Sequence, residues 1–234
     1  MENKMVFVYK YWDVFCRELR EHGIEGVTAQ TVAENKSQKP YLILKHDVET
    51  NVSKAYTLAS IEKKYGHCGS YYVQAYLLNS KKNIKMLLKM SKMGHEISYH
   101  YDVMDSNMGN IGDAIKEFEK NKKTFERNGF RIVTVCQHGN PVIDRKGYTS
   151  NRDFFRSRQV QKLYPGILDI MVNFHISTES KFIYYSDAGR IFQKIYDPLN
   201  NDINESAGKN VCFDRLDDIL NDIINNKKNS IISI

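Results

Sequence analysis

The chain has 234 residues and a formal net charge of +6, and a chain of this length is expected to fold as one domain. It contains 41% hydrophobic and 26% charged residues, with only 13 glycines and 4 prolines, which excludes a disordered, collagen-like or low-complexity protein. The longest apolar runs are far shorter than the roughly 20 residues that cross a bilayer, so we expect no membrane span.

The targeting and charge signals are weak. The segment Met1–Lys10 lacks an apolar stretch and carries Glu2, so we expect no secretory signal and a cytoplasmic protein. Four cysteines lie singly, without a C-x-x-C pair, and we expect all of them to be reduced and buried: Cys16, Cys68, Cys136 and Cys212. The basic residues are scattered, which favours a solvated surface over a nucleic-acid patch and remains compatible with an anionic small substrate.

The first elements are predicted by periodicity. A helix over Tyr9–Arg20 carries one apolar stripe, and we interpret residues 1–39 as an N-terminal helical extension. The run Tyr41–Val48 is apolar and then abruptly polar, like a buried strand that emerges at its carboxyl end. A helix is expected from about Ser53 to Lys64.

The same alternation continues along the chain and is typical of a βα-repeating fold. It predicts strands at Gly69–Tyr76, Glu96–His100 and Arg131–Cys136, with helices at about Ile84–Met93 and Gly112–Arg127.

Beyond Pro141 the signals weaken. We expect strands at Phe182–Tyr185 and Ser230–Ile234 and a helix at Leu216–Ile224. No repeat or linker divides the chain, so we predict a single domain over residues 1–234.

Polar side chains gather where three of the predicted strands end. These strands deliver, in order, His46, Asp47 and Glu49, then His100 and Asp102, then His138 and Asn140. Sites in parallel α/β folds form at the carboxyl ends of the strands. Carboxylates and imidazoles that meet there are suitable ligands for a divalent transition metal such as zinc, with one carboxylate left to act as a base.

Several of these residues also have a structural interpretation. His46 alone is better explained as a packed histidine that a backbone group satisfies. Asp47 and Glu49 lie on one side of an extended segment and repel unless a cation lies between them, which favours a site. His95 follows a glycine at a helix-to-strand turn and is interpreted as structural, so His100 is the better ligand.

A later motif, YYSDAGR, contains Asp187 and Arg190. These two residues are equally well explained as a structural ion pair or as a substrate clamp.

Short blocks of the sequence carry a resemblance to a known family. They are LILKHDVE (Leu42–Glu49), GSYYVQ (Gly69–Gln74), GHEISYHYD (Gly94–Asp102), QHGNP (Gln137–Pro141) and YYSDAGR (Tyr184–Arg190). In this order they resemble the polysaccharide deacetylase (NodB-homology) family, in its divergent intracellular branch among glycan-biosynthesis proteins. The GHEI-x-x-H block beside HDV is the most specific of them.

The resemblance implies a distorted (β/α) barrel of about seven strands and a metal-dependent amidohydrolase that removes acetyl groups from N-acetylated sugars. By the same resemblance, Asp47 is the base, Glu49 the acidic metal ligand and His100 the first metal histidine. The family usually has a second histidine four positions later, where this chain has Met104, and Glu49 stands where aspartate is commoner. The third protein ligand therefore stays open.

We therefore predict a zinc-dependent N-deacetylase, with one divalent metal, that acts on a nucleotide- or lipid-linked sugar in cell-surface glycan biosynthesis. Candidates for substrate binding or for the third ligand are His46, Asp102, His138, Asn140, Asp187 and Arg190. One alternative is a non-catalytic glycan- or protein-binding module on the same fold, which Met104 favours. Another is a metal-dependent hydrolase of a different bond, such as a phosphoester.

The end of the sequence bears on the same choice. The resembling family draws its general acid from a histidine just after a late apolar strand, and this chain stops at Ile234 within such a strand. We infer a shortened form or a tail missing from the sequence shown. The alternative, a natural terminus, fits the binding module.

Overall fold

The structure is a computed structural model that describes residues 9–35, 40–140, 142–186, 192–195, 211–213 and 215–234. Asp187 and Arg190 lie outside the described residues, as does most of the YYSDAGR block to which they belong.

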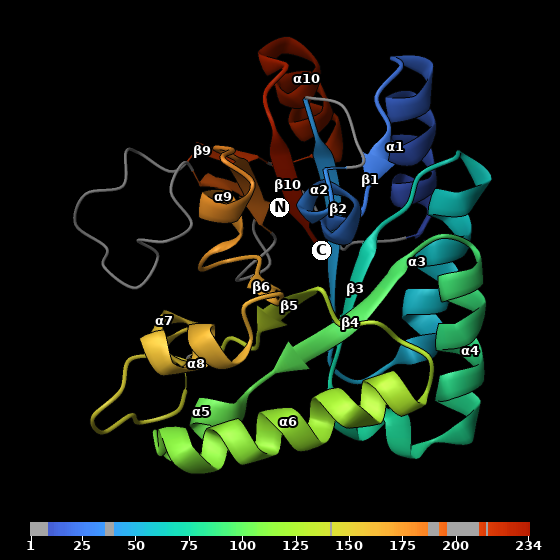
Figure 1. Cartoon of the computed structure of the whole chain (residues 1–234). Helices are drawn as coiled ribbons and strands as arrows, with labels where there is room; N and C mark the ends of the chain where they lie inside the picture. Colours follow the sequence, from blue (N-terminus) through green and yellow to red (C-terminus); the bar gives the residue numbers. More distant parts are fainter. Residues whose placement is uncertain (1–8, 36–39, 141, 187–191, 196–210, 214) are drawn as a thin grey trace.

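A curled half-barrel of seven parallel strands forms the body of the molecule (Figure 1). In spatial order they are β6 (Leu168–Asp169), β5 (Thr134–Gln137), β4 (Glu96–Tyr101), β3 (Ser70–Val73), β2 (Leu42–Val48), β10 (Ser230–Ser233) and β7 (Ile183–Ser186). Two antiparallel strands, β8 (Phe192–Ile195) and β9 (Val211–Phe213), extend the sheet beyond β7. A short β1 (Gly26–Val27) pairs with the start of β2. The predicted distorted (β/α) barrel of about seven strands is confirmed.

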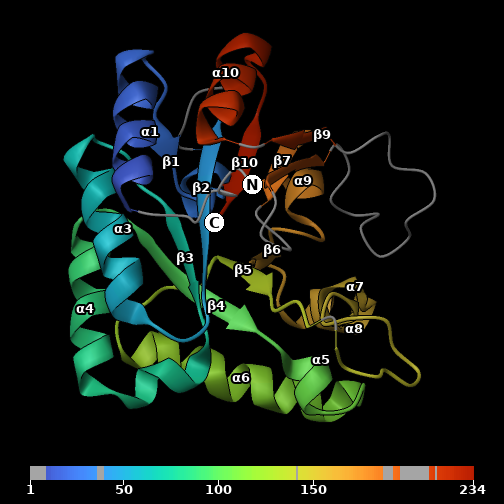
Figure 2. The same cartoon turned by 180° about the vertical axis from the view of Figure 1, so that it is seen from behind.

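The long helices pack around the outside of the sheet (Figures 1 and 2). They are α1 (Tyr9–Glu21), α3 (Val52–Lys64), α4 (Lys81–Lys92), α6 (Ile111–Arg127) and α10 (Leu216–Asn226). Shorter elements lie in the connections: α2 (Ala29–Ala33), η1 (Ala75–Asn79), α5 (Val103–Ser106), α7 (Asp153–Arg156), α8 (Arg158–Leu163) and α9 (Phe174–Ser177). The first and last residues of each long helix lie within three residues of the predicted ones.

Two of the predicted strands differ from the observed ones. The strand expected at Gly69–Tyr76 ends at Val73, because the chain turns into the 3₁₀ helix η1. The strand expected at Arg131–Cys136 begins only at Thr134. Ile132 and Val133 are buried although they lie outside β5, whereas Tyr76 of η1 is exposed, so aromatic and β-branched composition alone does not mark where these strands end.

The inner face of the sheet encloses its own apolar cluster, which α2 and α9 close from one end. Members of this cluster include Ile43, Tyr72, Cys136, Phe174 and Tyr184. Strand alternation places Glu96, Ser98 and His100 of β4 on this same inner face, with His100 nearest the carboxyl end.

A buried carboxylate, Glu96, connects the amino-terminal end of the half-barrel to α2, and we call this end the floor. Glu96 Oε2 accepts hydrogen bonds from the Gln30 backbone N–H at 3.0 Å and from the Ser70 hydroxyl at 2.7 Å. Its other oxygen accepts from Thr134 at 2.5 Å. Burial raises the pKa of Glu96 despite these donors. The polar contacts therefore fix α2 at the end of the half-barrel opposite to the polar strand ends.

A second buried carboxylate ties α1 to the sheet. Glu62 of α3 is fully buried and accepts hydrogen bonds from Trp12 Nε1 at 3.2 Å and from the Tyr71 hydroxyl at 2.9 Å, while His46 Nε2 lies 2.7 Å from Oε1. Burial opposes ionisation of Glu62, but His46, His95 and the Tyr71 hydroxyl together outweigh it, and the pKa of the carboxyl lies below its ordinary value. The α1 helix thus contributes to the packing of the body.

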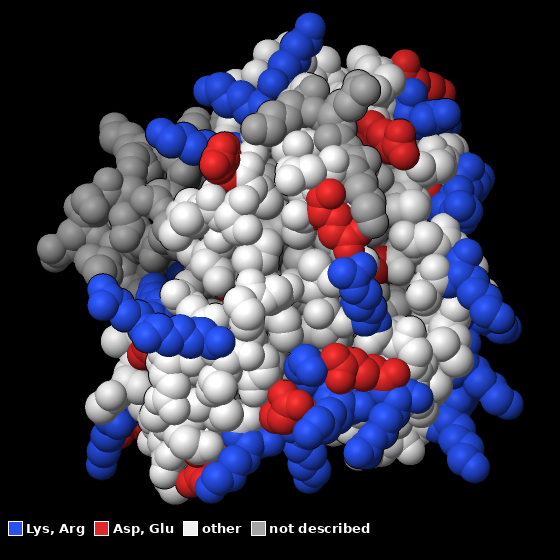
Figure 3. All heavy atoms as spheres, viewed as in Figure 1, with Lys and Arg blue, Asp and Glu red and all other residues white. Residues whose placement is uncertain are grey.

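Surface properties agree with a solvated exterior. On the face shown in Figure 3, most Lys and Arg side chains lie around the rim, interleaved with acidic ones. On α6, for example, Lys122 pairs with Glu126, and Lys123 pairs with Glu119. None of the described helices is long and apolar enough to span a membrane.

The cysteines differ in part from expectation. All four are free of disulfide bonds, and Cys16 and Cys136 are buried. Cys68 is half-buried and Cys212 is exposed, so the prediction that all four are buried was wrong. Cys212 belongs to β9 in the antiparallel extension of the sheet, whose position the weak sequence signals beyond Pro141 did not reveal.

If α1 is an integral part of the domain, Trp12→Ala should lower the free energy of unfolding by about 3–5 kcal/mol, because it removes a buried aromatic side chain and a donor to Glu62. Tyr11→Ala is the matched control, since Tyr11 is 47% exposed on the same helix, and it should change the free energy by less than about 0.5 kcal/mol. Urea unfolding followed by circular dichroism measures both. Equally small changes in the free energy of unfolding for both variants would show that α1 contributes little to the stability of the domain.

Candidate functional site

Alternation along β2 points three charged side chains toward the inner face of the half-barrel. Lys45 is fully buried, and the Asp47 side chain is 31% exposed. The Glu49 side chain, just after the end of the strand, is 50% exposed. The neighbouring parallel strands β3, β4 and β5 are in register, so their carboxyl ends meet at the same edge. His100 of β4 and His138, just after β5, come to this edge as well.

Glu49, His100 and His138 form a candidate metal-ligand group. Glu49 Oε1 lies 3.1 Å from His138 Nε2 and 3.7 Å from His100 Nε2. The ring centroids of His100 and His138 are 5.3 Å apart, and the two rings are nearly perpendicular. One ligand atom from each residue lies within 4.8 Å of the others, which is the spacing that a single ion can bridge.

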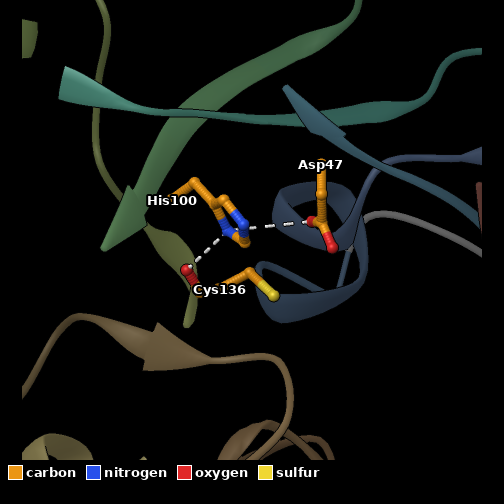
Figure 4. Close-up of side chains that lie close together, drawn as sticks. All are labelled: Asp47, His100 and Cys136. Carbon is orange, nitrogen blue, oxygen red and sulfur yellow. Dashed lines mark hydrogen bonds and ion pairs between the residues drawn. The ribbon is translucent and has the colours of Figure 1, made fainter. Parts of the chain in front are cut away.

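The tautomer of His100 is set by the backbone. Its Nδ1 lies 3.1 Å from the carbonyl oxygen of Cys136, as Figure 4 shows. A carbonyl oxygen only accepts, so in the neutral ring Nδ1 carries the proton and the lone pair is on Nε2. That Nε2 is buried and has no hydrogen-bond partner among the described residues, although Glu49 is close by. A buried acceptor without a donor, held in one orientation, is the arrangement found in metal-binding histidines.

A second group of possible ligands, Asp47, His100 and Cys136, shares the same histidine (Figure 4). Asp47 Oδ1 approaches His100 at Nδ1, at 3.8 Å, which is the nitrogen that carries the proton. Burial strongly raises the pKa of the Cys136 thiol, so a metal bound there would have to displace the thiol proton. The group of Glu49, His100 and His138 is therefore the better candidate metal centre.

Asp47 is anchored by a buried lysine instead. Lys45 Nζ donates to Asp47 Oδ2 at 2.6 Å and to the Ser233 hydroxyl of β10 at 3.0 Å. Burial opposes ionisation of Asp47, but the Lys45 ammonium and then His100 outweigh it, and the pKa of Asp47 lies below its ordinary value. Asp47 is thus held as an anion with one oxygen fixed by Lys45.

The electrostatics of the group suit a cation. When their rings are protonated, His100 and then His138 hold the pKa of the Glu49 carboxyl well below its ordinary range, against a smaller opposing effect of burial. Glu49 in turn raises the pKa of His138. A metal ion that binds here displaces the proton of His138 and takes over its attraction to Glu49.

The remaining candidates from the sequence lie in different places. Burial raises the pKa of Asp102, which precedes α5 and interacts electrostatically with His138 and His100. Asn140 Oδ1 accepts from the Val142 backbone N–H at 3.2 Å, so that side chain organises its own loop.

Two other histidines lie on the opposite face of their strands or turns. His46 stacks on Tyr71, with ring centroids 4.5 Å apart, and contacts Glu62, so it points away from the candidate metal centre. His95 accepts from the Gly69 N–H at 3.0 Å and donates to the Ala59 carbonyl at 2.9 Å, which confirms its structural interpretation.

Sequence reasoning did not assign Lys45. Its signal was period two, since it lies two positions before Asp47 on the same face of β2. A buried lysine in a strand needs an anionic partner, and Asp47 is the nearest one in that direction.

No protein-family model and no curated protein matches the chain. Two solved structures of peptidoglycan deacetylase PdaC from Bacillus subtilis, one of them a mutant, are similar to it at a TM-score of 0.41 and 11% identity, over 82% of this chain and 87% of that chain. At this low similarity the site is interpreted from its own side chains.

The Lys45 and Asp47 pair can be tested through stability. Asp47→Ala should lower the free energy of unfolding by about 3–5 kcal/mol, because it leaves the buried Lys45 ammonium without its anion. Asp47→Asn should cost less, since its side-chain oxygen still accepts from Lys45. In the double variant Lys45→Met with Asp47→Ala, much of the loss should be recovered. Urea unfolding of the metal-free protein measures all three, and additive losses in the double variant would contradict the pairing.

Proposed function

We propose that this protein is a zinc-dependent hydrolase that removes the acetyl group from an N-acetylated sugar. The observation that carries the proposal is the group of Glu49, His100 and His138, in which a buried His100 Nε2 without a hydrogen-bond donor faces a carboxylate and a second imidazole. One carboxylate and two imidazoles are a ligand set of catalytic zinc sites, which keep a further position for water or substrate.

These residues fit a metal, and each has a separate task. Glu49, His100 and His138 would hold the ion, and zinc bound there would supply Lewis acidity toward an amide carbonyl and the attacking water. The Cys136 carbonyl orients the His100 ring. Asp47, which is not needed as a ligand, accepts the proton of the attacking water through the oxygen that Lys45 leaves free.

The choice of bond and substrate is supported by the sequence resemblance. The blocks that resemble polysaccharide deacetylases supply Asp47 and Glu49 from one block, His100 from a second and His138 from a third. We propose a nucleotide- or lipid-linked N-acetyl sugar of cell-surface glycan biosynthesis as substrate, and a cytoplasmic location.

A pocket of about 500 Å³ borders Asp47 and Glu49 on one side only. Its lining also includes His46 and Leu58, whereas neither His100 nor His138 contributes to it. The pocket therefore reaches two of the proposed functional residues, and the proposal rests on the ligand group rather than on this cavity.

Metal content tests the ligand set. After chelation and reloading, the wild-type chain should bind about one zinc ion, whereas Glu49→Ala, His100→Ala and His138→Ala should each lose most of it. Cys136→Ala is the matched control and should retain the ion, because its backbone carbonyl remains. Elemental analysis of gel-filtered protein gives the stoichiometry. Zinc loss in Cys136→Ala with retention in His138→Ala would move the site to Asp47, His100 and Cys136.

Activity tests the role of Asp47. Asp47→Asn should lower kcat on a responsive N-acetyl sugar by on the order of 10²–10⁴-fold, because it removes the proton acceptor, and it should leave zinc content nearly unchanged. Release of acetate from a panel of nucleotide- and lipid-linked sugars is the measurement, with phosphoesters as the comparison panel. Cleavage of phosphoesters alone by the zinc-loaded wild type would refute the deacetylase proposal.

A further inference from the structure

The loop that carries His138 contacts a partly buried polar cluster, which consists of Asp105, Arg145 and Asn151. Asp105 belongs to α5, just after the strand that carries His100, whereas Arg145 and Asn151 come later in the chain. None of the three was singled out by the sequence, and none is among the candidate metal ligands.

Asn151 is the centre of this cluster. Its side chain is fully buried, and its oxygen accepts from the backbone N–H groups of Met104 and Asp105, each at 3.0 Å. Its amide nitrogen donates to Asp105 Oδ2 at 2.8 Å and to the carbonyl oxygen of His138 at 2.9 Å. The side chain therefore uses its full hydrogen-bonding capacity and joins the segment after His100 directly to the backbone of His138.

Arg145 holds the same loop at a second point. Its guanidinium makes a bidentate contact with Asp105, at 2.8 and 2.9 Å, and donates to the carbonyl oxygen of Asn140 at 2.7 Å. The His138 backbone N–H donates in turn to the Tyr101 carbonyl at 2.7 Å. The short segment from His138 to Asn140 is thus fixed by both its donors and its acceptors.

This arrangement matters because the two candidate metal histidines are held differently. His100 lies in a strand, and its ring is oriented by the Cys136 carbonyl. His138 lies after the end of β5, and in the described part of the structure the hydrogen-bonding contact of its ring is with Glu49, itself a candidate ligand. Without a metal-independent partner for the ring, the position of His138 depends on its backbone.

We infer that Asn151 is a positioning residue for the metal centre, which acts by holding the His138 backbone where the imidazole completes the ligand set with Glu49 and His100. The inference rests on the proposed metal-dependent function. Loss of partners that orient metal ligands typically weakens metal affinity 10- to 100-fold, and the same range is expected for loss of the Asn151 amide.

The experiment compares Asn151→Ala with Asn107→Ala, a matched variant at the end of α5. Asn107 donates from its amide to the Val103 carbonyl at 2.8 Å and to Glu117 at 2.6 Å, so it also anchors α5, through partners that lie outside the His138 loop. Zinc affinity is measured by competition with a chromophoric chelator. The visible absorption of the cobalt-substituted protein reports ligand geometry, and thermal unfolding without metal reports stability.

We expect Asn151→Ala to bind zinc about 10- to 100-fold more weakly than the wild type and to show an altered cobalt spectrum. Asn107→Ala should lower thermal stability but leave zinc affinity within about 3-fold and the cobalt spectrum unchanged, because a general loss of stability does not move the ligands. Arg145→Met should weaken zinc binding in the same direction as Asn151→Ala, and it decides the question if Asn151→Ala does not fold.

A folded Asn151→Ala variant, or a folded Arg145→Met variant in its place, with wild-type zinc affinity and cobalt spectrum would overturn this inference and leave the proposed function standing. An equal loss of affinity in Asn107→Ala would also overturn it, since the effect would then be one of general stability. A wild-type chain that binds no zinc would refute the proposed function together with the inference.

Discussion

The central constraint on this molecule is that β2 is buried on both faces while it carries charged and polar residues on both. Each face must therefore supply its own partners for these groups. On the inner face Lys45 pairs with Asp47. On the outer face His46 contacts the Glu62 carboxylate. That carboxylate also accepts hydrogen bonds from Trp12 of α1 and Tyr71 of β3. The same strand thus anchors the N-terminal helix on one side and presents the candidate base on the other.

Much of this could be predicted from the sequence, and the remainder has a common cause. The long helices and β2 have strong periodicity, and the polar residues at the strand ends identified Asp47, Glu49, His100 and His138 as neighbours. The short elements between Pro141 and Phe182 were not predicted, because a two-residue strand such as β6 has no period. Glu62 and Asn151 were missed because their partners lie up to 50 residues away in the chain, and no local pattern reveals such contacts.

The candidate centre combines side chains with different degrees of restraint. Asp47 and His100 are fixed by a buried ion pair and a backbone carbonyl, in strands that pair on both sides. Glu49 and His138 follow the ends of their strands; the Glu49 side chain is 50% exposed, whereas His138 is 21% exposed and its backbone is held by Asn151. Three restrained side chains beside one exposed carboxylate suit a site in which the proton acceptor must be placed accurately.

The floor formed by Glu96 and α2 determines how molecules reach this site. The amino-terminal end of the half-barrel is closed by a hydrogen-bonded carboxylate, and the interior above it is filled by the apolar cluster. Among the described residues, the packed interior leaves the polar strand ends as the side from which a ligand meets Asp47 and Glu49. Burial of the Glu96 carboxylate therefore separates the part of the sheet that holds the fold together from the part that is left for chemistry.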